Sequence, residues 1–98
     1  MNKIISFIIP SYNVEKYLSK ALDSFLAGDV LDKIEVLIVN DGSKDSTATV
    51  ANEYVEKYPE TYRLINKQNG GHGSAINTGA EAANGKFLKV IDADDWVI

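Results

Sequence analysis

The run Ile4-Ile5-Ser6-Phe7-Ile8-Ile9-Pro10 is apolar at nearly every position. A short continuous apolar run is typical of a strand that is covered on both faces, as the strands of parallel sheets are. The run also resembles the start of a signal peptide, but its apolar part, about six residues, is shorter than the roughly 7–15 residues that a signal peptide requires. We therefore predict a buried strand over residues 4–10.

Helical spacing follows this first strand. Apolar residues recur at positions i, i+3, i+4 and i+7 over residues 14–26, the pattern of one face of an amphipathic helix, and Asn13 is its expected N-cap. A second helix is expected after Asp45 or Ser46. An Ala-rich third helix is expected over residues 74–83, in spite of one internal glycine.

Further strands are expected over residues 34–39, 62–66 and 87–91, so strands and helices alternate along the chain. Parallel strands need such crossovers, and the helices then cover the faces of the sheet. The prediction is a Rossmann-like α/β fold with three layers, α/β/α, and a mainly parallel sheet. The length of 98 residues fits a single domain over residues 1–98.

The composition excludes several classes of protein. The chain has no cysteine, which rules out a disulfide scaffold and fits a reducing, cytoplasmic setting. Lys and Arg total 10 and Asp and Glu total 14, giving a net charge of −4. A nucleic-acid-binding protein normally carries a basic face, so no nucleic-acid partner is expected. No apolar run approaches the roughly 18 residues of a membrane-spanning helix.

Polar residues and glycines gather where each predicted strand ends. They are Pro10-Ser11-Tyr12-Asn13, Asn40-Asp41-Gly42-Ser43, Asn69-Gly70-Gly71-His72-Gly73 and Asp92-Ala93-Asp94-Asp95. The carboxyl ends of parallel strands share one edge of the sheet, and ligands of open α/β folds bind outside that edge. The sequence therefore predicts a binding site there.

The strongest chemical signal at this edge is the pair Asp92 and Asp94. Residues i and i+2 of an extended segment point to the same side, so the two carboxylates are expected to converge. Converging carboxylates repel each other unless a cation or proton intervenes, and hard divalent cations such as Mg²⁺ and Mn²⁺ favour oxygen ligands. The alternative interpretation is a solvated acidic turn.

Three other residues at this edge have both a binding and a structural interpretation. Asp41 is placed to accept hydrogen bonds from a ribose or a base, but Asp-Gly is also a common turn pair. Tyr12 offers a ring that stacks on a base, or one that packs over the start of a helix. His72 follows a Gly-rich loop, and we expect it to be exposed rather than catalytic.

Four motifs succeed one another over nearly the whole chain. They are Ile8-Ile9-Pro10-Ser11-Tyr12-Asn13, Val39-Asn40-Asp41-Gly42-Ser43, Asn69-Gly70-Gly71 with Ala75 and Asn77, and Asp92-Ala93-Asp94-Asp95. In this order they resemble the motifs of family-2 glycosyltransferases of the GT-A fold. The resemblance implies inverting transfer of a sugar from a nucleotide-sugar donor, usually linked to UDP, with Mn²⁺ or Mg²⁺ as cofactor. Polysaccharide biosynthesis is the implied setting.

The resemblance also implies roles for single residues. The implied donor-binding residues are Pro10, Ser11, Tyr12, Glu15, Asp41, Gly71, Asn77, Asp92 and Ala93. Among them Pro10 and Tyr12 would line the base pocket, and Asp41 would hydrogen-bond the uracil. Asp92 would lie by the ribose, and Asp94 together with Asp92 would form the metal site of a DXD motif.

The resemblance leaves two parts of the reaction unassigned. Ile76 stands where many relatives carry Arg, so one donor contact is missing. Family members continue beyond the position of Ile98 with acceptor-binding strands and an acidic general base, so we expect a truncated, donor-binding portion without transferase activity of its own. Its acceptor would be a carbohydrate or glycolipid, and membrane association through further segments stays open. An exposed sheet face is expected to favour self-association.

Two other interpretations compete with this one. A non-catalytic Rossmann-like nucleotide-binding or interaction module would keep the fold without the chemistry. A different Rossmann-like enzyme is disfavoured, because no G-x-G-x-x-G follows the first strand, as a nicotinamide oxidoreductase requires. An aspartate-based phosphotransferase would need its nucleophile where Ser11 stands.

Overall fold

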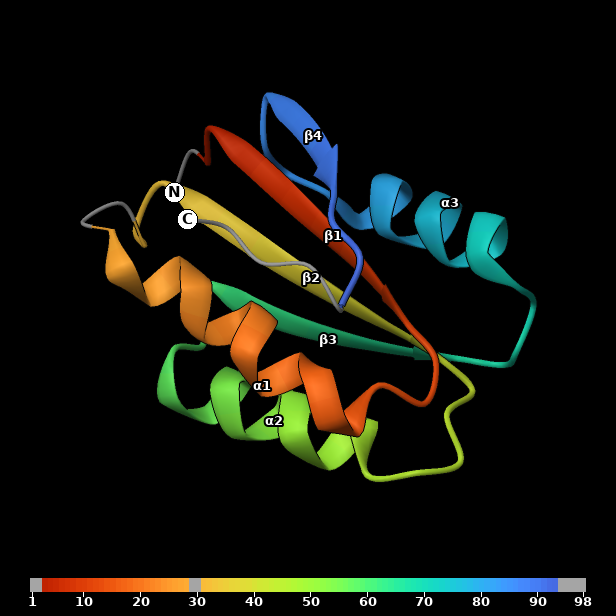
Figure 1. The fold of residues 1–98 in the computed structure, drawn as a ribbon. Coiled ribbons are helices and arrows are strands. Elements are labelled where there is room, and N and C mark those ends of the chain that lie inside the picture. Colours follow the sequence, from red (N-terminus) through yellow and green to blue (C-terminus); the bar gives the residue numbers. More distant parts are fainter. Residues whose placement is uncertain (1–2, 29–30, 94–98) are drawn as a thin grey trace.

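The computed structural model describes residues 3–28 and 31–93. Its strands form one parallel sheet in the order β3-β2-β1-β4, with helices between the strands along the chain (Figure 1). The strands are β1 (Ile5–Ser11), β2 (Ile34–Asp41), β3 (Tyr62–Lys67) and β4 (Phe87–Val90). The helices are α1 (Glu15–Asp23), the short 3-10 helix η1 (Ser24–Ala27), α2 (Thr47–Lys57) and α3 (His72–Ala82). The predicted alternation and the Rossmann-like α/β fold are confirmed.

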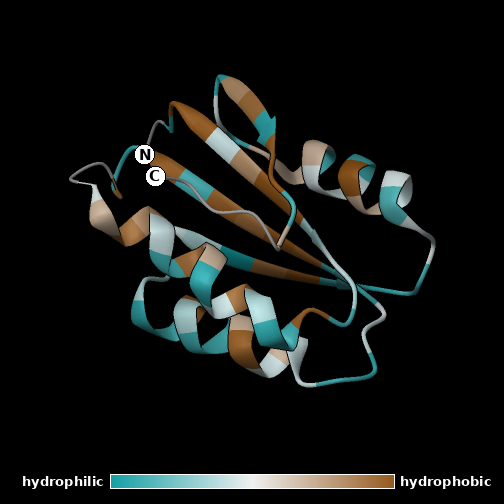
Figure 2. Ribbon diagram, viewed as in Figure 1, coloured by the Kyte–Doolittle hydropathy of each residue, from teal (hydrophilic) through white to brown (hydrophobic). Residues whose placement is uncertain are grey.

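The sheet lies between two helical layers. Helix α3 covers one face, and α1 and α2 cover the other (Figure 1). Side chains alternate along a strand, so Phe7 and Ile9 of β1 pack in the core cluster of α1 and α2. Ile8 packs on the opposite face, with Leu37 and Val39 of β2, against α3. Figure 2 shows the apolar residues that run along β1 and β2 through the centre of this two-sided core.

The internal glycine of α3, Gly79, is explained by its packing. It is buried against the sheet, and a Cβ atom at this position would lie only 2.6 Å from Cγ2 of Ile8 and 3.2 Å from Cγ2 of Val39. Glycine costs helix stability, about 1 kcal/mol relative to alanine. It is accepted here because it lets α3 approach β1 closely.

The start of α1 differs from the prediction. Asn13 is not the N-cap, because the helix begins at Glu15 and Asn13 has a left-handed conformation with φ of 53°. Its Oδ1 instead accepts a hydrogen bond from the backbone N–H of Lys44, 2.8 Å away. Oδ2 of Asp45 accepts from the backbone N–H of Glu15 at 3.3 Å, and Oδ1 accepts from that of Thr47 at 3.0 Å. The Asp45 carboxylate therefore accepts hydrogen bonds from the first residues of both α1 and α2.

Strand β4 is the least covered strand of the sheet. The side chains of Phe87, Leu88 and Val90 are 64%, 52% and 41% exposed. The described part of the chain thus presents the exposed apolar sheet surface that the sequence predicted. Within residues 3–28 and 31–93, no helix has both the length and the apolar character needed to cross a bilayer.

Candidate functional site

Two adjoining hollows lie at the carboxyl edge of the sheet, where the strands end. The Asp41 hollow, about 230 Å³, is lined by Pro10, Ser11, Tyr12, Asp41, Asn69, Gly71, His72 and Ala75. The Asp92 hollow, about 360 Å³, is lined by Pro10, Tyr12, Val14, Tyr17, His72, Asp92 and Ala93. Pro10, Tyr12 and His72 belong to both linings and form a shared wall. The structure therefore brings together most of the residues that the sequence predicted for a site.

Two predicted residues in the described part of the chain are not part of these linings. Glu15 is exposed in the first turn of α1, and Asn77 is exposed on α3. Neither is among the residues that line the two hollows. Asp94 lies outside the described residues, so its predicted metal role stays a prediction.

Asp41 is the centre of a hydrogen-bond network that shapes the Asp41 hollow. It ends β2 and its side chain is almost completely buried. Its Oδ1 accepts hydrogen bonds from Nζ of Lys67 and the backbone N–H of Gly70, each at 2.9 Å, and Oδ2 accepts from the backbone N–H of Gly71 at 2.9 Å. Its carbonyl oxygen accepts from Nδ2 of Asn69 at 3.0 Å. Asp41 thus holds the loop between β3 and α3 in place.

These contacts keep the Asp41 carboxyl group ionised. The hydrogen bond from Lys67 lowers its pKa below the usual 3.8, and the N–H groups of Gly70 and Gly71 lower it further against the opposing effect of burial. A carboxylate oxygen has about two acceptor positions. Among the described residues Oδ2 takes one hydrogen bond, from Gly71, so it retains acceptor capacity next to the hollow. A ligand N–H group is the partner that this capacity suits.

Lys67 is a site-shaping residue that the sequence analysis missed. The predicted third strand ended at residue 66, whereas β3 continues to Lys67, which lies opposite Asp41 in the register of the two strands. The signal available in the sequence was a lysine just after one predicted strand and an aspartate just after its neighbour. Recognising the pair requires the register between strands, which the apolar pattern alone does not supply.

Gly71 turns the chain from this loop into α3. Its φ is 97°, a value that favours glycine, and it is the N-cap of α3. The turn directs its N–H to Asp41 while its carbonyl oxygen accepts from the backbone N–H of Ala75 at 3.0 Å. Helix α3 consequently begins at His72, earlier than the predicted residue 74.

The end of β1 contributes an aromatic wall. Tyr12 is 47% exposed and borders both hollows, so its ring is accessible for stacking. Ser11 is buried, and its hydroxyl donates to the carbonyl oxygen of Ile9 at 3.0 Å. Tyr12 therefore offers an accessible ring at this wall, whereas the Ser11 hydroxyl is turned to its own strand.

Asp92 and His72 face each other across the Asp92 hollow. Asp92 follows β4, and Ala93 beside it is buried. Nε2 of His72 lies 3.9 Å from Oδ1 of Asp92, and the two side chains are 64% and 57% exposed. His72 is exposed, as predicted. The described residues contain no group of three or more His, Cys, Asp or Glu side chains that could hold a metal. Of the predicted carboxylate pair, only Asp92 belongs to the described part of the chain.

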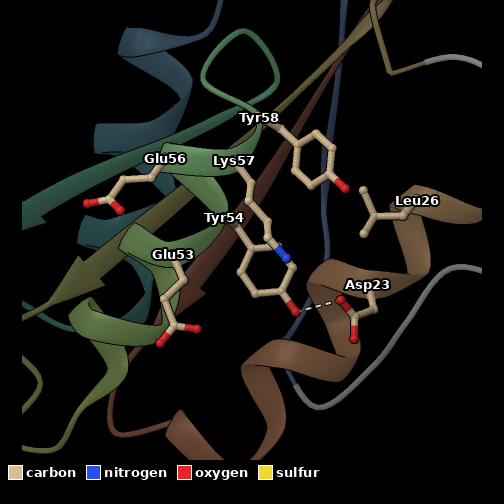
Figure 3. Close-up of a pocket in the computed structure, with 7 residues that line it drawn as sticks. All are labelled: Asp23, Leu26, Glu53, Tyr54, Glu56, Lys57 and Tyr58. Carbon is tan, nitrogen blue, oxygen red and sulfur yellow. Dashed lines mark hydrogen bonds between the residues drawn. The ribbon is translucent and has the colours of Figure 1, made fainter.

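A larger hollow lies at the opposite edge of the sheet, where α1 and α2 end. Its volume is about 420 Å³, and its lining is Asp23, Leu26, Glu53, Tyr54, Glu56, Lys57 and Tyr58 (Figure 3). The hydroxyl of Tyr54 donates to Oδ1 of Asp23. Burial and this hydrogen bond raise the pKa of Tyr54 to about 12. Three carboxylates against one lysine make this hollow unsuited to an anionic ligand.

The family model for glycosyl transferase family 2 matches residues 6–98. The chain belongs to this family. A relative, the uncharacterised glycosyltransferase EpsJ of Bacillus subtilis, is 39% identical over 97 residues, which are 99% of this chain and 28% of EpsJ. The minor teichoic acid biosynthesis protein GgaB of the same species is also 39% identical over 97 residues, 98% of this chain and 11% of GgaB. This family-2 chain therefore spans less than a third of the length of these relatives.

Solved structures support the same assignment of the fold. The mannosyltransferase PcManGT of Pyrobaculum calidifontis, in complex with GDP-Man and Mn²⁺, superposes with a TM-score of 0.87 at 27% identity, covering 98% of this chain and 29% of PcManGT. Residues 1–349 of TarS from S. aureus, in complex with UDP-GlcNAc, give a TM-score of 0.86 at 32% identity, covering 95% of this chain and 27% of that structure. The GT-A type of the Rossmann-like fold is confirmed.

Proposed function

We propose that this chain is the donor-binding portion of a metal-dependent glycosyltransferase whose donor is a UDP-sugar. The observation that carries the proposal is the buried Asp41 carboxylate, which is held by Lys67 and two glycine N–H groups and still borders a hollow. Such a group is preorganised to accept one further hydrogen bond without reorganising. The membership of family 2 and the nucleotide-sugar complexes of similar structures support the proposal.

The hydrogen bonds that the Asp41 carboxylate already accepts favour uracil as the base. Among the described residues, Oδ2 of Asp41 accepts one hydrogen bond, from the N–H of Gly71, and has room for one more. Uracil offers a single imide N–H, which matches this one remaining acceptor position. Guanine offers two neighbouring donors, which pair best with two free carboxylate oxygens, and Oδ1 of Asp41 already accepts from Lys67 and Gly70. The accessible ring of Tyr12 is available to stack on the base.

The Asp92 hollow fits a divalent cation next to the diphosphate. Asp92 is more than half exposed, and its carboxylate is an oxygen ligand of the type that Mg²⁺ and Mn²⁺ prefer. Asp92 would hold the cation, together with Asp94 as the second carboxylate of the DXD motif. When bound, the cation supplies Lewis-acid stabilisation of the departing diphosphate. It also offsets the repulsion between a polyanionic donor and a chain of net charge −4.

The acceptor half of the reaction is a proposal from family membership alone. The acceptor is a hydroxyl of a carbohydrate or glycolipid, as polysaccharide biosynthesis requires, and transfer inverts the anomeric configuration. Inverting transfer needs a general base to take the proton of that hydroxyl. We assign no residue of this chain to that role, so we expect the chain to bind donor without transferring sugar.

Isothermal titration calorimetry with UDP, GDP and ADP, each with and without Mn²⁺, tests the proposal. We expect UDP to bind best, Mn²⁺ to strengthen binding, and Asp94→Asn to remove that strengthening. Asp41→Asn should weaken UDP binding whether or not Mn²⁺ is present. The matched control is Asp23→Asn, which makes the same chemical change in the hollow at the opposite edge and should leave the affinity for UDP unchanged.

The outcomes separate the parts of the proposal. Stronger binding of GDP than of UDP would contradict uracil recognition, although a nucleotide site would remain. Equal loss of affinity in Asp23→Asn would move the site to the other edge of the sheet. A folded chain that binds no nucleotide would overturn the donor-binding function itself.

A further inference from the structure

His72 borders the proposed donor site but has no assigned role in it. It is the first residue of α3 and belongs to the wall shared by the Asp41 and Asp92 hollows. Its Nε2 lies 3.9 Å from Oδ1 of Asp92, and both side chains are more than half exposed. It is also the single histidine of the chain. An imidazole next to a carboxylate at the edge of a proposed metal site calls for a chemical explanation.

The separation of the two atoms is too long for a hydrogen bond but short enough for a cation to bridge them. A hydrogen bond between nitrogen and oxygen spans about 2.7–3.2 Å, so 3.9 Å is too long for one. A divalent cation lies about 2.1 Å from a nitrogen or oxygen ligand, so it reaches two ligand atoms up to about 4.2 Å apart. Both side chains are exposed, so small rotations can direct Nε2 of His72 and Oδ1 of Asp92 toward the same cation.

Charge decides which kind of ligand fits between the two side chains. An anion there would meet the Asp92 carboxylate at close range, whereas a cation is attracted to that carboxylate and to the lone pair of a neutral imidazole. The N-terminus of α3 beside His72 carries the positive end of the helix dipole and does not favour a cation by itself. Negative charge from Asp92 and from the donor diphosphate is therefore what holds the cation at this point.

We propose that Nε2 of His72 is a ligand of the divalent cation alongside Asp92, and that it gives the site a preference for Mn²⁺ and Co²⁺ over Mg²⁺. This inference rests on the proposed metal-dependent donor site. Imidazole nitrogen suits transition metals, whereas Mg²⁺ is bound through carboxylate, phosphate and water oxygens. Phosphate oxygens and water complete the shell, which accounts for a site with few protein ligands among the described residues.

The decisive test is electron spin echo envelope modulation of Mn²⁺ bound to the chain together with UDP. The protein is prepared without a histidine tag, once unlabelled and once with ¹⁵N-labelled histidine. Because the chain has one histidine, any nitrogen coupling that changes from the ¹⁴N to the ¹⁵N pattern belongs to His72. We expect that change in the wild type, and no nitrogen coupling of this kind in His72→Ala.

Metal titrations of three variants give an independent readout. His72→Ala should weaken Mn²⁺ binding at least about tenfold, since losing even a group that supports a metal ligand costs roughly 10–100-fold. Mg²⁺ binding should change much less. His72→Asp restores an oxygen ligand, so Mg²⁺ binding should be kept while the preference for Mn²⁺ falls. Asn52→Ala, at an exposed position of α2, is the control and should bind both metals as the wild type does.

Each outcome bears on the inference. Mn²⁺ that binds, and is lost in Asp92→Asn, without histidine coupling would overturn the role of His72 and leave the proposed metal site standing. Failure of the folded wild type to bind Mn²⁺ in the presence of UDP would overturn both. Histidine coupling together with a reduced Mn²⁺ preference in His72→Asp is the result that supports the inference.

Discussion

Strand β2 carries a buried carboxylate near each end, and the two behave differently. Glu35 lies near the amino end of the strand and Asp41 at the carboxyl end, and both are almost completely buried. They are separated by an even number of positions, so both face α3. Asp41 holds the loop that enters α3. Glu35 holds the loop that leaves it, through the backbone N–H of Asn84.

Glu35 is satisfied by the chain itself. Its Oε1 accepts hydrogen bonds from Oγ of Ser6 at 2.7 Å and from the backbone N–H of Asn84, and its Oε2 accepts from Nδ2 of Asn84 at 3.3 Å. The guanidinium of Arg63 lies 3.7 Å from Oε2, and Oγ of Ser6 accepts from the backbone N–H of Gly85 at 2.8 Å. Glu35 lines none of the hollows described above. It therefore fastens the fold without meeting a ligand.

The difference between the two carboxylates lies in what surrounds them rather than in burial. Each carboxylate has one oxygen that accepts a single hydrogen bond among the described residues, Oδ2 of Asp41 and Oε2 of Glu35. Only Asp41 borders a hollow, whereas Oε2 of Glu35 lies 3.7 Å from the guanidinium of Arg63. Strand direction explains this, because in open α/β sheets ligands bind beyond the carboxyl ends of the strands. A buried carboxylate indicates a binding site only where it also borders a hollow that a ligand can enter.

The largest effect is expected for Asp41→Asn. The substitution removes the charge that pairs with Lys67 and places an amide donor among other donors. We expect a loss of about 3 kcal/mol in the free energy of unfolding, because removing one partner of a buried ion pair strands the other. Urea denaturation measures this loss, and calorimetry of the folded fraction should show weakened UDP binding. Unchanged UDP affinity would contradict the role of Asp41 as a ligand-facing group.

Glu35→Gln is the matched change at the other end of β2. The amide keeps the shape of the side chain but loses the charge that Asn84, Ser6 and Arg63 stabilise, so we expect a loss of about 2 kcal/mol in the free energy of unfolding. The UDP affinity of the folded protein should stay within about twofold of the wild type, since a twofold change is only about 0.4 kcal/mol. A large loss of affinity in this variant would remove the distinction between the two carboxylates.

Acidification should lower the free energy of unfolding through both carboxylates, by less than either substitution does. The pKa of Asp41 is lowered from 3.8, chiefly by the hydrogen bond from Lys67. Burial raises the pKa of Glu35, but hydrogen bonds from Asn84 and Ser6 and the charge of Arg63 outweigh it and lower the pKa from 4.5.

A lowered pKa in the folded state stabilises the protein above the unfolded pKa, and this stability is lost as the pH falls through the folded pKa. The free energy of unfolding should therefore decline as the pH falls from about 5 toward 3 and below. Urea titrations at several pH values check this. The decline should be shallower in Asp41→Asn and in Glu35→Gln, and equal slopes in all three proteins would contradict the assignment.

The smallest effect is expected for Tyr54→Phe in the hollow at the opposite edge of the sheet. It removes one hydroxyl that donates to Asp23, so we expect a loss of about 1 kcal/mol in the free energy of unfolding. Thermal denaturation of the variant and the wild type measures the loss. UDP affinity should not change in Tyr54→Phe. A change would link this hollow to the donor site.

The strands and helices were predictable because they depend on short-range patterns. Continuous apolar runs predicted β1 and β2, and spacing at i, i+3 and i+4 predicted α1, whose apolar face is buried against the sheet. The start of α1 was not predictable from its own residues. Asp45, distant along the chain, bonds the first N–H of the helix, while Asn13 is engaged by Lys44.

The candidate site was predictable in its location but less so in its contacts. Polar residues at the strand ends identified Pro10, Tyr12, Asp41 and Asp92 as neighbours of two adjoining hollows. The partner of Asp41, Lys67, was missed, because it depends on the register of two strands rather than on a local pattern. Glu35 was missed for a related reason: its partners Ser6 and Asn84 are distant along the chain, so a charged residue inside an apolar run does not indicate them.

A ¹H–¹⁵N NMR titration with UDP and Mg²⁺ tests most directly the claim that the carboxyl edge is the donor site. The amides of Gly70 and Gly71 donate to Asp41, so they report on any ligand that reaches its carboxylate. We predict shifts at these amides and at Tyr12, with the amides of Asn84 and Gly85 near Glu35 unchanged. Shifts concentrated at Tyr54 and Tyr58, with Gly70 and Gly71 unmoved, would contradict it.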